Sequence, residues 1–193
     1  MDKTLQITLA RSNLKGHLIQ MNKPQQKGQT DALNVLEDLI AKAKKSGADA
    51  ADAVLVEGVS LSKSIRMGKP EHLERSENCD IGLRVLVGRR QAMVSSSDIT
   101  PRAMDELAAR ALAMAKAVPE DPFCGFADVN QLATNFPDVQ SCDSFEPDAE
   151  HLNDLANRAE QAALAVDGIN NSEGASAGWG LNTVAMSASN GFS

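Results

Sequence analysis

The middle of the chain alternates hydrophobic and polar residues in the way that β-strands do. Residues 51–57 are apolar on both faces, as in a central strand, and 59–67 place apolar and polar side chains on opposite sides. A polar strand is expected over 71–75, a regularly alternating one over 81–87 and a last one over 91–96. Because short links join these segments, the pattern predicts an antiparallel meander.

Apolar residues recur at helical spacing in three other segments, 31–46, 101–117 and 147–166. Thr30 and Thr100 are the expected N-caps of the first two, since a threonine hydroxyl can accept a hydrogen bond from a first-turn amide. The sequence therefore predicts one helix before the meander and two after it.

The end of the chain is rich in Gly, Ser and Asn, and we expect a hairpin region over 170–188. Asn190-Gly191 is the strongest short hairpin signal, yet only Phe192 and Ser193 follow it. A hairpin turn without a second strand predicts that the chain is a natural or engineered fragment.

Together these elements predict an α+β fold. We expect an antiparallel, curved sheet of about five or six strands with two or three amphipathic helices packed on one face. Residues 1–28 are rich in Gln, Asn and Lys and lack the apolar core of a secretory signal, so they are interpreted as a flexible leader. Residues 29–193 would then form the folded domain.

Charge narrows the classes of function. The chain of 193 residues has 19 basic and 26 acidic residues, for a net charge of −7. This balance argues against a nucleic-acid surface, which needs clustered Lys and Arg. No apolar run approaches the roughly 20 residues of a membrane helix, so a soluble cytosolic protein is favoured.

The residue types that bind metals are few and scattered. The histidines and cysteines are His17, His72, His151, Cys79, Cys124 and Cys142. No H-E-x-x-H motif, no C-x-x-C pair and no other pair of ligands at helical spacing is present. We therefore predict no catalytic, metal-binding or cofactor-binding residue in this chain.

Two other features suggest chemistry but have simpler interpretations. Ser95-Ser96-Ser97 lacks a G-x-S-x-G context and a nearby His, which favours a strand end leading into a helix cap. The carboxylates Glu71, Glu74, Glu77 and Asp80 are expected to form a solvated edge that deters edge-to-edge pairing.

A series of short motifs runs through residues 33–193. The motifs are Ser46–Asp52, Ser64–Gly68, Ile81–Val85, Ser95–Asp98 with Thr100-Pro101, Pro119–Pro122, Asn171–Ala175 and Ser189–Phe192. No single motif is specific, but the ordered set resembles the N-terminal domain of the TldD/PmbA family, once called modulators of DNA gyrase, and is closer to the PmbA branch.

Ten residues of these motifs are expected to have structural roles. They are Gly47, Asp49, Gly68, Gly82, Asp98, Pro101, Glu173, Gly174, Asn190 and Gly191. None matches a catalytic or metal-binding position of the family, so the resemblance assigns no such role here.

The resemblance implies a cytosolic protein that works in a heterodimer of a TldD-type and a PmbA-type subunit. Together the two subunits form a metallopeptidase that trims or degrades peptides, including microcin precursors and an antitoxin. The resemblance implies that the zinc motif belongs to the TldD-type subunit. It also implies that the motif lies in a region of the family's sequence beyond the point where this chain ends.

The leading interpretation is a non-catalytic N-terminal fragment of a PmbA-like subunit. It would build a wall of a peptide channel, where an extended peptide could add to a sheet edge. One alternative is a non-enzymatic regulatory or binding module, as the gyrase name suggests. Another is a non-functional truncated product of a longer gene.

Overall fold

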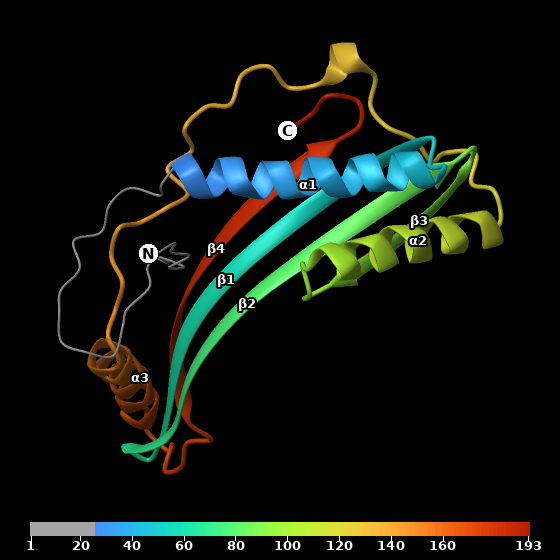
Figure 1. The fold of residues 1–193 in the computed structure, drawn as a ribbon. Coiled ribbons are helices and arrows are strands. Elements are labelled where there is room, and N and C mark those ends of the chain that lie inside the picture. The colour runs from blue at the N-terminus through green and yellow to red at the C-terminus, as the bar shows by residue number, and fades with distance from the viewer. Residues whose placement is uncertain (1–25) are drawn as a thin grey trace. The chain divides into compact units, whose positions relative to one another are not determined.

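The computed structural model describes residues 26–193, with side chains from residue 31 onward, so most of the expected leader lies outside the described residues. The elements are α1 (Gln26–Ser46), β1 (Ala50–Arg66), β2 (Lys69–Val87), β3 (Arg90–Ser96), α2 (Pro101–Ala117), the short 3₁₀ helix η1 (Val129–Gln131), α3 (Ala149–Leu164) and β4 (Ala175–Ala188) (Figure 1). No helix in this part of the chain has the length and apolar character needed to cross a membrane.

The strands form one four-stranded sheet in the order β3-β2-β1-β4 (Figure 1). The α+β class is confirmed, but the expectation of five or six strands is wrong for residues 26–193, which form four. The segments 51–57 and 59–67 are one strand, and so are 71–75 and 81–87, because no turn interrupts the extended backbone between them. The expected hairpin over 170–188 is also a single strand, β4, which pairs with β1.

The chain forms two compact units, which we name by their helices. The described part of the α1–α2 unit comprises residues 26–57, 78–137 and 183–193, and that of the α3 unit comprises 58–77 and 138–182. The assignment of 29–193 as one family domain stays a prediction.

The core of the α1–α2 unit lies between its two helices and one face of its strands (Figure 1). Ile81, Leu83 and Val85 alternate along β2 and are at most 1% exposed, as their spacing predicts. The buried helical residues are Leu36, Leu39, Ile40, Ala43, Met104, Leu107, Ala108, Ala111, Leu112 and Ala115. Strands β2 and β3 pair antiparallel, with Leu83 opposite Val94.

The ends of α1 and α2 differ in how well the sequence locates them. Thr100 caps α2 as expected, because its side chain accepts a hydrogen bond from the N–H of Ala103 at 3.4 Å. Helix α1 begins at Gln26, so Thr30 lies inside the helix and the expected cap is wrong.

The core of the α3 unit is smaller. Leu152 of α3 packs with Trp179 and Leu181 of β4, and the partly buried Val59 and Leu61 of β1 join them. Asp148 caps α3, with its carboxylate accepting the N–H of His151 at 2.8 Å. Helix α3 therefore begins at Ala149 rather than at the expected residue 147.

A buried leucine and an exposed one on the same strand give a matched test of the core. Leu83→Ala should lower the free energy of unfolding by about 3 kcal/mol, because Leu83 is only 1% exposed and its truncation leaves a cavity in the core. Leu73→Ala, at 53% exposure, should cost less than about 0.5 kcal/mol. Urea unfolding of both variants checks this, and equal losses would contradict the described strand β2.

Candidate functional site

The motif residue Gly47 ends α1, and Asp49 then holds the turn between β2 and β3. Gly47 ends α1 with φ of +111°, a conformation that suits glycine. Asp49 Oδ2 then accepts the N–H of Gly88 in the turn at 2.7 Å, and the N–H of Asp49 donates to Leu86 O at 2.9 Å. Asp49 therefore satisfies main-chain groups of a hairpin that lies far along the chain, and Gly47 ends the helix that precedes it.

Asp98 and Pro101 start helix α2. Asp98 Oδ1 accepts the N–H of Thr100 at 2.8 Å, and this hydrogen bond lowers the pKa of the Asp98 carboxyl below its usual value of 3.8. Pro101 is the first helical residue, where its missing N–H costs nothing.

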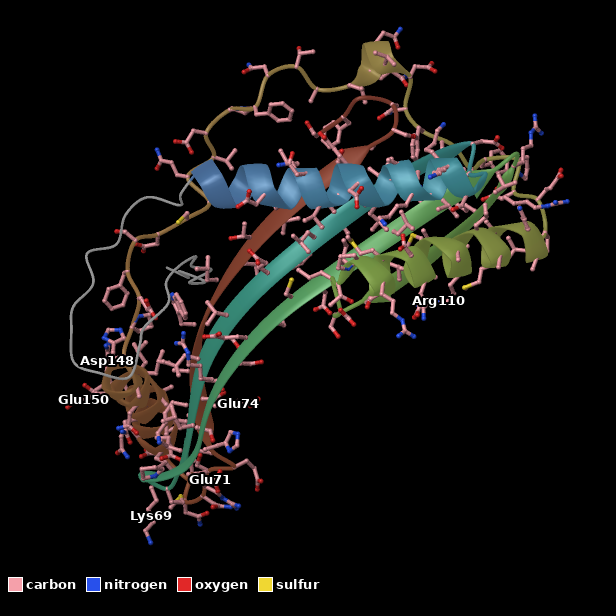
Figure 2. The ribbon with its side chains drawn as sticks, in the orientation of Figure 1. Lys69, Glu71, Glu74, Arg110, Asp148 and Glu150 are labelled. Atoms are coloured by element: carbon pink, nitrogen blue, oxygen red, sulfur yellow. The ribbon has the colours of Figure 1, made fainter. Side chains whose placement is uncertain are left out.

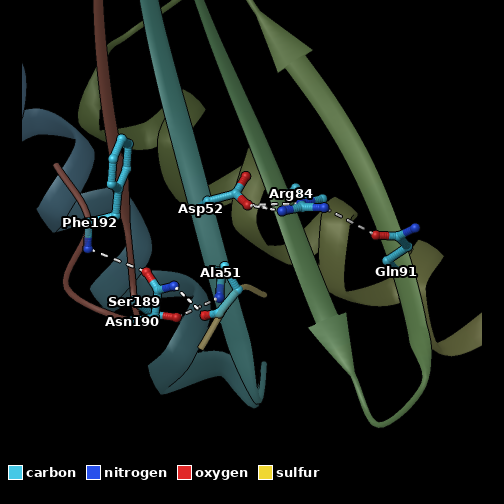
Figure 3. Close-up of polar contacts among 8 residues, drawn as sticks. Ala51, Asp52, Arg84, Gln91, Ser189, Asn190 and Phe192 are labelled. Carbon is cyan, nitrogen blue, oxygen red and sulfur yellow. Dashed lines mark hydrogen bonds and ion pairs between the residues drawn. The ribbon is translucent and has the colours of Figure 1, made fainter. Parts of the chain in front are cut away.

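Gly82, Asn190 and Gly191 lie where the backbone is crowded or reverses. A Cβ at Gly82 would lie 3.1 Å from Val54 Cγ1. Asn190 donates from Nδ2 to Ala127 O at 3.1 Å, and Gly191 has φ of +94° in the turn that follows β4 (Figure 3). The turn expected at Asn190-Gly191 is present.

Gly68, Glu173 and Gly174 belong to the α3 unit. Met67 and Gly68 have φ of +48° and +71°, as in the tight turns of two-residue hairpins. Gly174 has φ of +116°, and a Cβ there would lie only 2.7 Å from Ile65 O. Glu173 is largely exposed, and its Oε1 lies 4.0 Å from Nη2 of Arg66. Gly68 and Gly174 again shape the backbone, whereas Glu173 approaches only a side chain.

Glu160 is the buried charge that sequence reasoning missed. The apolar spacing in 147–166 predicts that Ala159, Ala163 and Val166 pack in the core, but all three are exposed, whereas Glu160 is 1% exposed. Its two carboxylate oxygens accept the N–H groups of Met67 and Gly68, each at 2.7 Å. A glutamate one position from an apolar stripe is a weak signal, because only the approach of the β1–β2 turn gives it partners.

These contacts change the acidity of Glu160. The hydrogen bond from the Gly68 N–H lowers the pKa of the carboxyl below its usual 4.5, and bonds from Ser172 and Met67 act in the same direction. Burial opposes them by disfavouring the charged form, but the hydrogen bonds prevail. The carboxylate therefore stays ionised at neutral pH and closes the turn.

A second polar group lies on the α1–α2 unit, across neighbouring strands. Arg84 Nε donates to Asp52 Oδ2 at 2.8 Å, its Nη2 contacts the same oxygen, and its Nη1 lies 3.5 Å from Gln91 Oε1 (Figure 3). The Phe126 ring covers the guanidinium, with Arg84 Cζ at 5.1 Å from the ring centroid. Every charge here has a partner, and we interpret the group as a clamp between strands.

The described residues do not offer a zinc donor set. No group of three or more His, Cys, Asp or Glu residues in residues 26–193 could hold a metal ion. His72 is exposed beside Glu74, and the ring of His151 packs against Phe145 at 5.1 Å. His17 lies outside the described residues. We therefore derive no catalytic step through a metal on this chain.

Solved structures place the fold in a class. The chain is similar to a candidate modulator of DNA gyrase from Bacteroides thetaiotaomicron, with a TM-score of 0.69, 18% identity, and coverage of 84% of this chain and 37% of that one. It is also similar to TldE from Thermococcus kodakarensis, with a TM-score of 0.63, 15% identity, and coverage of 81% and 35%. At these identities the likeness shows the fold alone.

Sequence comparison identifies the family. Residues 51–115 match the model of PmbA/TldA metallopeptidase domain 1. Over 146 residues the chain is 34% identical to metalloprotease PmbA of Escherichia coli O157:H7. That alignment covers 74% of this chain and 32% of the relative. It is also 36% identical over 136 residues to a metalloprotease PmbA homolog of Haemophilus influenzae. That alignment covers 69% of this chain and 30% of the homolog. The chain belongs to the PmbA/TldD family and spans about a third of the length of these relatives.

The contribution of the buried carboxylate can be measured through pH. The pKa of Glu160 is lower in the folded state than its usual 4.5. The carboxylate therefore stabilises the fold at pH values above 4.5, and this stabilisation is lost as the pH falls through the lowered pKa. Glu160→Gln should therefore lower Tm at pH 7 by on the order of 5 °C. The difference from the wild type should shrink below pH 4.5.

Glu150→Gln is the matched control, since Glu150 is an exposed residue of the same helix (Figure 2). It should change Tm by less than about 2 °C. An equal effect of both variants at pH 7, measured by thermal unfolding, would contradict the role of Glu160.

The close approach at Gly174 is tested against another glycine. Gly168 also has a positive φ, +88°, but a Cβ there would meet nothing within 4 Å. Gly168→Ala should cost about 1 kcal/mol of unfolding free energy for its backbone conformation. Gly174→Ala should cost at least about 2 kcal/mol, because its Cβ also strikes the Ile65 carbonyl. Denaturant unfolding that ranks the two the other way would refute the described packing.

Proposed function

We propose that this chain is the non-catalytic N-terminal part of a PmbA-like subunit in a TldD/PmbA-type metallopeptidase complex that acts on peptides. The observation that carries the proposal is the 34% identity to metalloprotease PmbA over 146 residues of this chain. This chain spans 32% of the length of that relative. We therefore propose for it the role of one part of such a subunit and not the activity of the whole.

A scaffold role fits the way in which the motif residues are used. Asp49 and Asp98 direct their carboxylates at main-chain N–H groups. Gly68 and Gly174 allow conformations that a side chain would strain. Side chains that are fully used to hold turns and helix ends are not free for chemistry, which supports a structural role for them.

The zinc of the complex would then belong to a TldD-type partner in a heterodimer. The sequence contains no H-E-x-x-H motif, and no described cluster of side chains suits zinc. The proposal places the complex in the cytoplasm, with an extended peptide as its substrate. Main-chain hydrogen bonds to a sheet edge would allow peptides of different sequence to bind.

Two measurements test this proposal. The purified chain, supplied with Zn²⁺, should leave a flexible peptide such as casein uncleaved, because residues 26–193 offer no ligand set that could hold the metal and activate water. A tagged form of the chain should also retain a TldD-type subunit in a pull-down assay. A complex of that TldD-type subunit with a full-length PmbA relative is the positive control for cleavage.

Zinc-dependent cleavage by the chain alone, removed by a chelator, would show that the chain is itself catalytic. Failure to retain the TldD-type subunit, while the full-length relative retains it, would contradict the proposed partner.

A further inference from the structure

Helix α3 is held on its strands by few buried side chains. Of its 16 residues Leu152, Ala156 and Glu160 are buried, and their spacing of four places them on one narrow stripe. Helix α2, with 17 residues, buries six. Among the described residues, the apolar core of the α1–α2 unit has 18 buried members and that of the α3 unit has three. Burial therefore stabilises α3 on the sheet much less than it stabilises α1 and α2.

The carboxylate of Glu160 is the polar contact that completes this stripe. Besides the N–H groups of Met67 and Gly68, it accepts a hydrogen bond from the hydroxyl of Ser172. Ser172 Oγ in turn accepts the N–H of Gly174 at 2.9 Å. One side chain of α3 therefore joins the helix both to the β1–β2 turn and to the segment that leads into β4.

The charged contacts at the two ends of α3 are weak. Before the helix, Glu146 Oε1 lies 3.9 Å from Arg75 Nη1. After the helix, Glu173 Oε1 lies 4.0 Å from Arg66 Nη2. Both distances are at the limit for an ion pair, and such pairs near a surface contribute little to stability. The helix is therefore held mainly by its buried stripe.

The segments on both sides of α3 allow it to move without the strands. Residues 118–148 contain one short 3₁₀ helix, η1, and residues 165–174 contain no helix or strand (Figure 1). Neither segment contributes a strand to the sheet. Helix α3 can therefore leave the sheet while β1, β2 and β4 remain paired.

Trp179 lies beneath the helix in an environment that lowers the cost of opening. Its side chain is 4% exposed and packs with Leu152 and Leu181. The indole Nε1 is buried and has no hydrogen-bond partner among the described residues. A buried donor without an acceptor is costly, and it can donate to water once the helix has left. The closed position is therefore less stable than its apolar contacts alone would make it.

We propose that α3 is a lid. It opens from the sheet as a unit of its own while the α1–α2 unit stays folded, and the Glu160 carboxylate is the latch that keeps it closed. Opening uncovers the sheet face formed by Val59, Leu61, Trp179 and Leu181. A helix of 16 residues is marginal in water by itself, so the amides of α3 exchange with solvent once it has left the sheet.

Native-state hydrogen exchange of the whole chain, at rising urea concentrations below the unfolding transition, tests the lid. The amides of α3 should exchange at least about 100-fold faster than those in the middle of α2. Their rates should also depend less on urea, because opening exposes less surface than global unfolding. Leu107→Ala, at a position of α2 that is 2% exposed, should speed exchange in α2 and leave α3 unchanged.

Glu160→Gln tests the latch. A carboxamide has one acceptor oxygen, and its NH₂ group would face the second N–H of the turn. The variant should therefore speed exchange of the α3 amides at least about tenfold, whereas Glu150→Gln, at an exposed position of the same helix, should not. Trp179 is the only tryptophan in a chain without tyrosine, so its fluorescence reports the uncovered face. Quenching by acrylamide should increase in Glu160→Gln and stay unchanged in Glu150→Gln.

Equal exchange of α3 and α2 in the wild type, or an equal response of both to Leu107→Ala, would show one cooperative unit and overturn the proposal. The wild type decides this point even where Glu160→Gln does not fold, which circular dichroism checks. Unchanged α3 exchange in a folded Glu160→Gln would refute the latch. Faster exchange without greater quenching would show a helix that frays in place, and no lid. Neither a TldD-type subunit nor a peptide is present, so this result and the proposed function stand or fall separately.

Discussion

The fold depends on the pairing of main-chain groups at the turns of its long strands. The clearest example is the carboxylate of Glu160, which accepts two successive N–H groups of the β1–β2 turn at 2.7 Å each. Burying the N–H groups of Met67 and Gly68 beside α3 without an acceptor would leave two unsatisfied donors, at about 1–3 kcal/mol each. The carboxylate therefore allows helix and turn to lie together.

The same principle explains the motif residues. Asp49 holds Gly88 of the next turn, Asp98 accepts the N–H of Thr100, and Asn190 reaches Ala127. The glycines complete the set by taking backbone conformations that other residues avoid. Residues of this kind specify where the chain turns.

Prediction from sequence succeeded where a signal is local. The alternation of Ile81, Leu83 and Val85 identified the face of β2 that is buried, and Thr100-Pro101 located the start of α2. Prediction failed where the structure of a segment depends on contacts with residues distant in sequence. No local rule separates one strand of 17 residues from two short ones, because the pairing of β1 with both neighbours keeps it extended. The alanine-rich sequence of α3 likewise did not reveal that Glu160 would be buried.

By itself, the sequence determined the α+β class, the buried face of Ile81–Val87, the turn glycines and the family resemblance. These follow from periodicity and from backbone preferences that each residue carries with it. The tertiary structure alone decided the number and order of the described strands and the partners of Glu160 and Arg84. Those features depend on which segments distant in sequence pack together, and a local sequence pattern does not contain the free energy of that packing.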